Sequence, residues 1–139
     1  MDNIVLDTNV LVMSLSSKNR YRYIWQSFVD GRFTLCITNE IIEEYTEVLA
    51  RNINPRVAEA VVFAILTRRN VRRVDHHMRY RLIEADLDDN KFVDCALFAN
   101  AKFIVTEDHH FKVLKDIPFP HVDVIDIDDF MTYLGLISE

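Results

Sequence analysis

Short runs of branched apolar residues, separated by segments with helical spacing, constrain the fold of this chain more than any other feature. Apolar runs without alternating polar residues are typical of strands buried on both faces, which occur in parallel sheets covered by helices. The predicted strands are Ile4 to Leu6, Phe33 to Ile37, Val71 to Val74, Lys102 to Val105 and Val122 to Ile125. The pattern predicts an α/β fold with a central parallel sheet of four to five strands.

Apolar residues with helical spacing fill the intervals between these strands. Helices are predicted over residues 20–30, 39–51 and 57–67, from residue 88 or 89 onward, and from 128 to 134. Gly31 suits the end of the first helix, and Asn54, which precedes a proline, suits the start of the third. Asp88 or Asp89 is expected to cap the fourth helix, and Asp128 the last.

The composition supports one domain over residues 1–139. Half of the 139 residues are hydrophobic, 27% are charged, and only two glycines and three prolines occur. This apolar content is sufficient for a buried core. The scarcity of glycine and proline excludes collagen-like and low-complexity architectures.

The sequence gives no sign of membrane insertion or export. No apolar stretch approaches the roughly 18 residues of a membrane span, and no basic segment precedes the first apolar run. Cys36 and Cys95 lie among apolar residues, which is typical of small buried thiols in a reduced protein. We therefore expect a soluble, cytoplasmic protein.

Acidic residues follow two of the predicted strands. Asp7 ends the first strand, and the fourth runs through Thr106 into Asp108. The carboxyl ends of parallel strands share one edge, where binding sites form. The helix that begins near Asp89 has its N-terminus at that edge, and Glu44 lies beside the apolar stripe of its own helix. We therefore expect these four carboxylates to lie close together.

Four neighbouring carboxylates without an assigned basic partner would repel one another and raise each other's pKa values. A hard divalent cation removes that conflict. All-oxygen ligands suit Mg²⁺ or Mn²⁺, whereas Zn²⁺ prefers histidine or cysteine. Such clusters support metal-dependent hydrolysis of phosphodiester bonds.

Each acid also has an ordinary structural interpretation. Asp89 is suited to a helix cap, Asp108 to a turn after a strand, and Glu44 to a solvated helix face. Asp7 is the hardest to explain in this way, because it interrupts an apolar run and is costly to bury.

The ordered set of acidic segments resembles the PIN domain, and most closely the VapC-like toxins of toxin–antitoxin systems. The matching segments are Val5-Leu6-Asp7-Thr8-Asn9-Val10-Leu11, the helix from Thr38 to Glu44, Asp86-Leu87-Asp88-Asp89-Asn90-Lys91-Phe92 and Ile104-Val105-Thr106-Glu107-Asp108. The resemblance covers nearly the whole chain and implies a PIN-like α/β/α sandwich.

The resemblance also implies a ribonuclease that depends on Mg²⁺ or Mn²⁺. The family's metal-binding and catalytic acids correspond to Asp7, Glu44, Asp89 and Asp108. Thr8, Asn9 and Thr106 correspond to polar residues that support these acids through hydrogen bonds. Many members have a second aspartate where this chain has His110, which leaves open whether one metal binds or two.

The implied partners are an RNA substrate and an antitoxin protein, and a homodimer is expected. A different possibility is a PIN-like module that binds RNA or protein with impaired catalysis. A phosphohydrolase with an Asp-x-Asp motif is the weaker enzyme alternative, because Asn9 stands where the general acid is needed.

Basic residues concentrate in one part of the acidic chain. The net charge is −6, yet residues 51–81 contain eight arginines and two acids, a local balance of +6. This segment is either a solvated face or a track for RNA phosphates. The candidate phosphate-binding residues are Arg68, Arg69, Arg72 and Arg73.

Overall fold

Five parallel strands form the central sheet of the protein. The structure is a computed structural model that describes residues 1–75, 83, 89–118 and 120–137. The strands are β1 (Asn3–Leu6), β2 (Thr34–Ile37), β3 (Val71–Arg73), β4 (Phe103–Val105) and β5 (Val124–Ile125). Their order is β3-β2-β1-β4-β5, and every neighbouring pair is parallel. The predicted parallel sheet is therefore confirmed.

The strand order reverses direction between β1 and β4. From β1 the chain proceeds outward through β2 to β3, and it returns to the other side of β1 for β4 and β5. Leu6 pairs with Val105, so the two strands end at the same level. Open parallel sheets bind ligands outside the carboxyl ends of strands at such a reversal.

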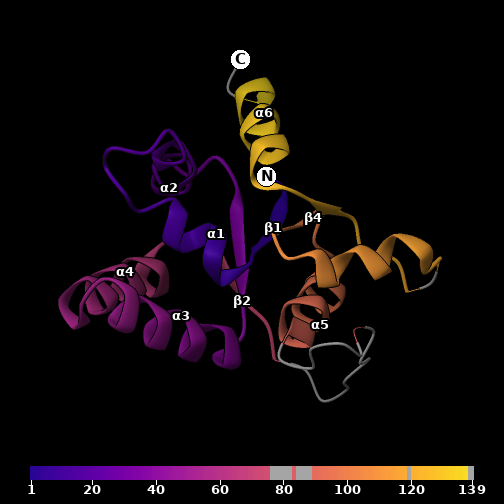
Figure 1. Cartoon of the computed structure of the whole chain (residues 1–139), viewed down its shortest axis with the longest axis horizontal. Coiled ribbons are helices and arrows are strands. Elements are labelled where there is room, and N and C mark those ends of the chain that lie inside the picture. The colour runs from indigo at the N-terminus through magenta and orange to yellow at the C-terminus, as the bar shows by residue number, and fades with distance from the viewer. Residues whose placement is uncertain (76–82, 84–88, 119, 138–139) are drawn as a thin grey trace.

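Helices cover both faces of the sheet (Figure 1). They are α1 (Thr8–Met13), α2 (Arg22–Val29), α3 (Asn39–Asn52), α4 (Pro55–Thr67), α5 (Asn90–Ala99) and α6 (Ile127–Ile137), with the 3₁₀ helix η2 (His109–Asp116). Right-handed crossovers put α1 to α4 on one face and α5 on the other. The expected α/β/α sandwich is thus confirmed.

The ends of the helices follow local side-chain chemistry. The Asn54 side chain accepts a hydrogen bond from the backbone N–H of Val57, as predicted, and Gly31 lies just beyond α2 with a φ of 77°. The prediction for Asp128 is wrong. Asp126 caps α6 instead, because its carboxylate accepts from the backbone N–H of Asp129 at 2.7 Å.

The core fills the space between the sheet and its helices. Strand residues Ile4, Val5 and Ile104 are completely buried, as are Tyr45 of α3 and Phe130 of α6. Both cysteines are free and buried. Among the described residues, no helix has the length and apolar character to cross a membrane.

Candidate functional site

Asp7 lies at the reversal point of the sheet, where β1 ends and α1 begins. It is the N-cap residue of α1, and its Oδ1 accepts a hydrogen bond from the backbone N–H of Thr8 at 2.8 Å. Its Oδ2 accepts from the hydroxyl of Thr106 at 2.7 Å. Only 6% of the residue is exposed. The chain therefore buries a carboxylate at the one place in the sheet where ligands are expected.

Burial raises the pKa of Asp7 above its ordinary value, because the charged form loses solvation. The hydrogen bonds from Thr106 and from the Thr8 backbone lower that pKa, while the negative charges of Glu44 and Asp108 raise it. The burial effect is the largest, so the ionised carboxylate is unfavourable in the protein alone. A bound cation would relieve that cost.

Thr106 connects Asp7 to Asp108. Its hydroxyl donates to Asp7, and the same oxygen accepts a hydrogen bond from the backbone N–H of Asp108 at 3.0 Å. The Asp108 carboxylate then accepts from the backbone N–H of His110 at 2.9 Å and begins η2. The chain after β4 is thereby held so that a second carboxylate lies beside the first.

Glu44 reaches the site from α3. Its Oε2 accepts a hydrogen bond from the hydroxyl of Thr8, the residue after Asp7. Its helix is anchored by the neighbouring Tyr45, whose buried hydroxyl donates to the carbonyl of Leu6 at 2.5 Å. Burial holds the pKa of Tyr45 well above its usual value, so the phenol remains a donor. Glu44 is partly buried, whereas Glu43 and Glu47 on the same helix are exposed.

Lys91 of α5 provides a cation that the sequence interpretation did not assign. Its Nζ lies 2.8 Å from Oε1 of Glu44, and the side chains are 13% and 25% exposed. The expectation of four carboxylates without a basic partner is therefore wrong for Glu44. Asn90 fixes the start of the same helix, because its amide donates to and accepts from the backbone of Ile83.

His110 lies between the remaining two acids. Its Nδ1 is 3.4 Å from Oδ2 of Asp89 and 3.4 Å from Oδ1 of Asp108. In the described part of the chain this Nδ1 makes no hydrogen bond. Asp89 occupies the N-cap position of α5, but its side chain does not cap the helix. Its carboxylate, 13% exposed, is instead near the imidazole.

Of the three predicted supporting residues, two touch the acids. Thr8 donates to Glu44 and Thr106 donates to Asp7. Asn9 is exposed, and its side chain makes no hydrogen bond to any described residue. Asp94, five residues after Asp89 in the sequence, is buried, with 1% exposed.

Three of the four candidate RNA-binding arginines donate hydrogen bonds within the protein, each to a different partner. Arg68 donates to the carbonyl of Val29 at 3.1 Å, and Arg72 donates to that of Ala99 at 3.2 Å, both at helix ends. Arg73 bonds the side chain of Asn39 at the start of α3, and Arg69 is exposed. Two further arginines of the basic segment, at 79 and 81, and residues 86–88 lie outside the described residues.

The donors of the site fit a hard divalent cation. Hydrogen bonds of Thr8 and Thr106 connect Asp7 to Glu44 and to the backbone of Asp108. Asp89 approaches this group only through His110, whose Nδ1 lies 3.4 Å from both Asp89 and Asp108. Among the described residues, the acids and histidines whose ligand atoms all lie within 4.8 Å of one another are Asp108, His109 and His110. Asp7, Glu44 and Asp89 do not belong to this close group. Carboxylate oxygens are the ligands of Mg²⁺ and Mn²⁺, and the buried Asp7 lacks a cation of its own in the described part of the chain.

Comparison with known proteins agrees with this fold. The structure is similar to a chain of VapBC2 from Rickettsia felis, solved bound to a DNA fragment from its promoter. That match has a TM-score of 0.59 and 15% identity, covering 89% of this chain and 98% of the other. It is also similar to PAE2754 from Pyrobaculum aerophilum, with a TM-score of 0.62, 12% identity, and coverage of 98% and 90%.

No curated protein matches the chain. The model of the PIN domain matches residues 3–110, which contain both strands of the reversal point and all four carboxylates. On this match, the chain belongs to the PIN domain family.

Proposed function

We propose that this protein is a ribonuclease that hydrolyses RNA phosphodiester bonds and depends on Mg²⁺ or Mn²⁺. The observation that carries the proposal is the buried carboxylate of Asp7, whose pKa is raised mainly by burial and which is linked through threonine hydroxyls to Glu44 and Asp108. Carboxylates whose pKa is shifted by burial and neighbouring charges concentrate at functional sites. Membership of the PIN domain family supports the assignment.

We assign the roles of the four acids from their positions in the fold. Asp7 and Asp108 follow the two strands of the reversal point and are the proposed principal metal ligands, while Glu44 and Asp89 complete the set from α3 and α5. When bound, a divalent ion supplies an acidified water and stabilises the leaving oxygen. Thr106 and Thr8 orient the acids, and a carboxylate accepts the proton from the attacking water.

We further propose that the protein acts as the toxin of a toxin–antitoxin pair, as a homodimer in the cytoplasm. The support is the similarity to a chain of VapBC2, together with the absence of a membrane-spanning helix among the described residues. The partner would be an antitoxin protein that blocks the carboxylate site. Co-purification with the product of a small neighbouring gene, with loss of RNA cleavage in the complex, tests this part.

Divalent-dependent RNA cleavage tests the nuclease itself. The purified protein is incubated with RNA in Mn²⁺ and, separately, in EDTA, and is compared with Asp7→Asn. Cleavage is expected only for the wild type in Mn²⁺. Asp30→Asn is the matched control, because Asp30 is exposed at the end of α2 and loses the same charge. Undiminished cleavage by a folded Asp7→Asn protein would overturn the proposal.

A binding module with impaired catalysis is the second candidate, and a specific observation favours it. Lys91 and His110 bring basic side chains to Glu44, Asp89 and Asp108. Such groups compete with a metal for the same oxygens. Under this alternative the protein binds RNA in EDTA but neither binds Mn²⁺ nor cleaves RNA. Mn²⁺ titration and RNA-binding measurements on the same preparation distinguish the two candidates.

A further inference from the structure

A groove opens beside Asp108, on the side of the carboxylate site that faces β5 and α6. Its volume is about 290 Å³. It is lined by Thr106, Glu107, Asp108, His109, Lys112, Lys115, Val124, Ile125, Asp126 and Asp129. Because Thr106 and Asp108 belong to both, the groove is continuous with the proposed catalytic centre. Its volume is near the roughly 300 Å³ at the lower end of small-molecule sites, which suits a single nucleotide.

One wall of the groove is cationic. Lys112 and Lys115 project from η2, the 3₁₀ helix that begins directly after Asp108, and His109 is at its start. Both lysines are exposed, and neither forms an ion pair with any residue that the structure describes. Their ammonium groups are therefore available to an anionic ligand that lies in the groove.

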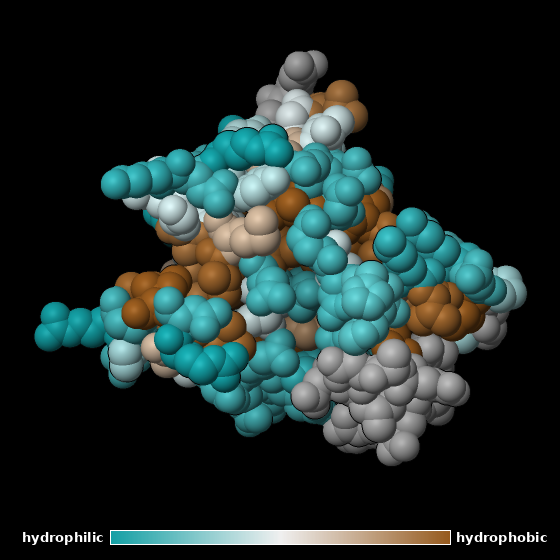
Figure 2. All heavy atoms as spheres, in the orientation of Figure 1, coloured by the Kyte–Doolittle hydropathy of each residue, from teal (hydrophilic) through white to brown (hydrophobic). Residues whose placement is uncertain are grey.

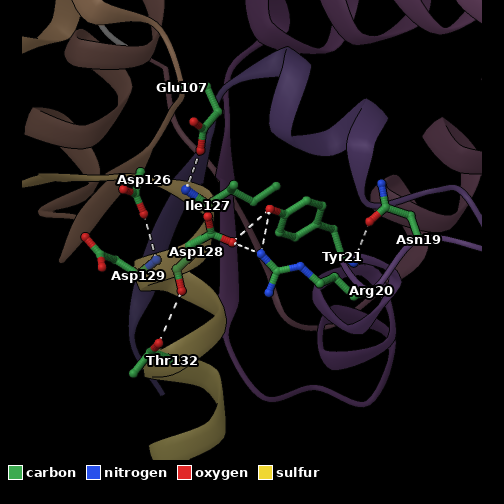
Figure 3. Close-up of polar contacts among 9 residues, drawn as sticks. All are labelled: Asn19, Arg20, Tyr21, Glu107, Asp126, Ile127, Asp128, Asp129 and Thr132. Carbon is green, nitrogen blue, oxygen red and sulfur yellow. Dashed lines mark hydrogen bonds and ion pairs between the residues drawn. The ribbon is translucent and has the colours of Figure 1, made fainter.

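Acidic residues also line the groove and form an acidic wall, in which two side chains are fixed in position. Glu107 accepts a hydrogen bond from the backbone N–H of Ile127 at 2.7 Å, and Asp126 accepts from that of Asp129. These bonds hold the first turn of α6 against the end of β4 (Figure 3). Asp128 takes no part in this wall, because it faces Arg20 and Tyr21 on the other side of the helix.

Walls of opposite charge select for a ligand with two chemically different sides. A single-stranded nucleotide has phosphate oxygens on one side, and N–H and O–H donors of its base and ribose on the other. Lysine ammonium groups attract the phosphates, while carboxylates accept from the donors and repel phosphates. Figure 2 shows that the surface between α3 and η2, beside the groove, is hydrophilic.

We propose, building on the proposed ribonuclease function, that this groove holds the RNA nucleotide next to the scissile phosphate. Lys112 and Lys115 bind its phosphates, and the acidic wall faces its base and ribose. The RNA strand therefore leaves the carboxylate site along η2, toward β5. This course is preferred to one along β3, because Arg68 and Arg72 each already donate one hydrogen bond to a carbonyl at a helix end.

RNA binding in EDTA tests the groove without requiring cleavage. The Lys112→Ala/Lys115→Ala double variant is compared with a Lys18→Ala/Lys102→Ala control, which has the same net charge of −8 instead of −6. We expect a short single-stranded RNA to bind the groove variant about five- to thirtyfold more weakly than the wild type. The slope of log K against log salt concentration should become shallower by about 1.4, the value expected for two lost phosphate contacts on a single strand. Affinities that fall equally in both double variants overturn the proposal.

Cross-linking locates the RNA directly. An oligonucleotide that contains 4-thiouridine is irradiated with the wild-type protein in EDTA, and the modified peptides are identified. Attachment within residues 107–129 is expected, and attachment confined to residues 68–73 contradicts the groove. The outcomes distinguish the two proposals. RNA cleavage with cross-links outside the groove contradicts only the proposed role of the groove. Cross-links in the groove without cleavage contradict only the proposed nuclease activity. If the wild-type protein binds no RNA, the proposed role of the groove is also contradicted.

Discussion

The hydroxyl of Thr106 donates a hydrogen bond to Oδ2 of Asp7 across 2.7 Å and thereby joins the end of β4 to the end of β1. The same oxygen accepts from the backbone N–H of Asp108. One side chain thus orients two of the proposed metal ligands, and its donated bond lowers the pKa of the buried Asp7. The reversal of strand order creates the crevice, and the hydrogen bonds of Thr106 position Asp7 and Asp108 within it.

Replacing Thr106 by valine removes this connection while keeping the shape of the side chain. The Asp7 carboxylate loses a donor and the Asp108 N–H loses its acceptor, so the free energy of unfolding should fall by about 1–3 kcal/mol. Because a residue that supports metal ligands has been removed, Mn²⁺ affinity or RNA cleavage should fall about 10–100-fold. Thermal unfolding and cleavage assays measure both effects. Thr106→Ser keeps the hydroxyl, and recovery by this variant is required for the interpretation to hold.

Asp7→Asn should stabilise the protein in EDTA while it abolishes divalent-dependent cleavage. Burial raises the pKa of Asp7, so the ionised carboxylate costs stability that a neutral amide does not. Replacements of this kind at functional sites commonly add about 0.5–2 kcal/mol to the free energy of unfolding. Chemical denaturation of both proteins in EDTA at pH 7 measures the difference. A less stable, still folded variant would show that the charge is compensated within the protein.

The stability gain of Asp7→Asn should also depend on pH in a defined direction. Above the raised pKa of the folded state, Asp7 is ionised in both the folded and the unfolded protein. The difference in unfolding free energy between Asp7→Asn and the wild type is then at its largest. As the pH falls through the folded-state pKa toward the unfolded value of 3.8, the folded wild type takes up its proton first and recovers stability. The two unfolding free energies should therefore converge as the solution is acidified. A difference between the two unfolding free energies that stays constant on acidification would contradict this prediction.

Tyr45→Phe should loosen the attachment of α3 to β1. The phenol is completely buried and donates to the carbonyl of Leu6, directly before Asp7. Its loss leaves a buried acceptor without this donor and should cost about 1–3 kcal/mol of unfolding free energy. Because Glu44 is the neighbouring residue on α3, cleavage should fall as well. Ile41→Val, on the same buried face, is the control: it costs about 0.5–1.5 kcal/mol without removing a hydrogen bond.

Much of the fold follows from the sequence, because buried parallel strands and amphipathic helices have distinct periodicities. The five strands were predicted within a few residues, and so was the helix that carries Glu44. The prediction missed α1, since Val10, Leu11 and Val12 after Asp7 continue the apolar character of the strand. In the folded protein the helix start is marked by hydrogen bonds from the Thr8 N–H to the Asp7 carboxylate and from the Leu11 N–H to the Asp7 carbonyl.

The basic residues that pair with the acids are harder to predict from the sequence. Lys91 lies two residues after Asp89, a spacing that puts the two side chains on different faces of α5, so nothing along the chain pairs it with Glu44 of another helix. The cap of α6 was misassigned because Asp126 and Asp128 are equally good cap residues. The choice depends on where the first turn begins, and the hydrogen bond that the Ile127 N–H donates to the Glu107 carboxylate fixes that point. Contacts between distant elements decide both cases.

The ion pair between Lys91 and Glu44 should restrain metal binding. With the two charged atoms 2.8 Å apart and both side chains largely buried, the ammonium neutralises one proposed ligand and repels a divalent cation nearby. Lys91→Met keeps most of the side-chain volume and removes the charge. Mn²⁺ affinity, followed by calorimetry, should rise at least about fivefold, while the metal-free protein becomes less stable because Glu44 loses its partner. Lys102→Met is the control, since Lys102 pairs with Asp2 at the other end of the strands. Weaker Mn²⁺ binding by Lys91→Met would instead show that the lysine orients Glu44 for the metal.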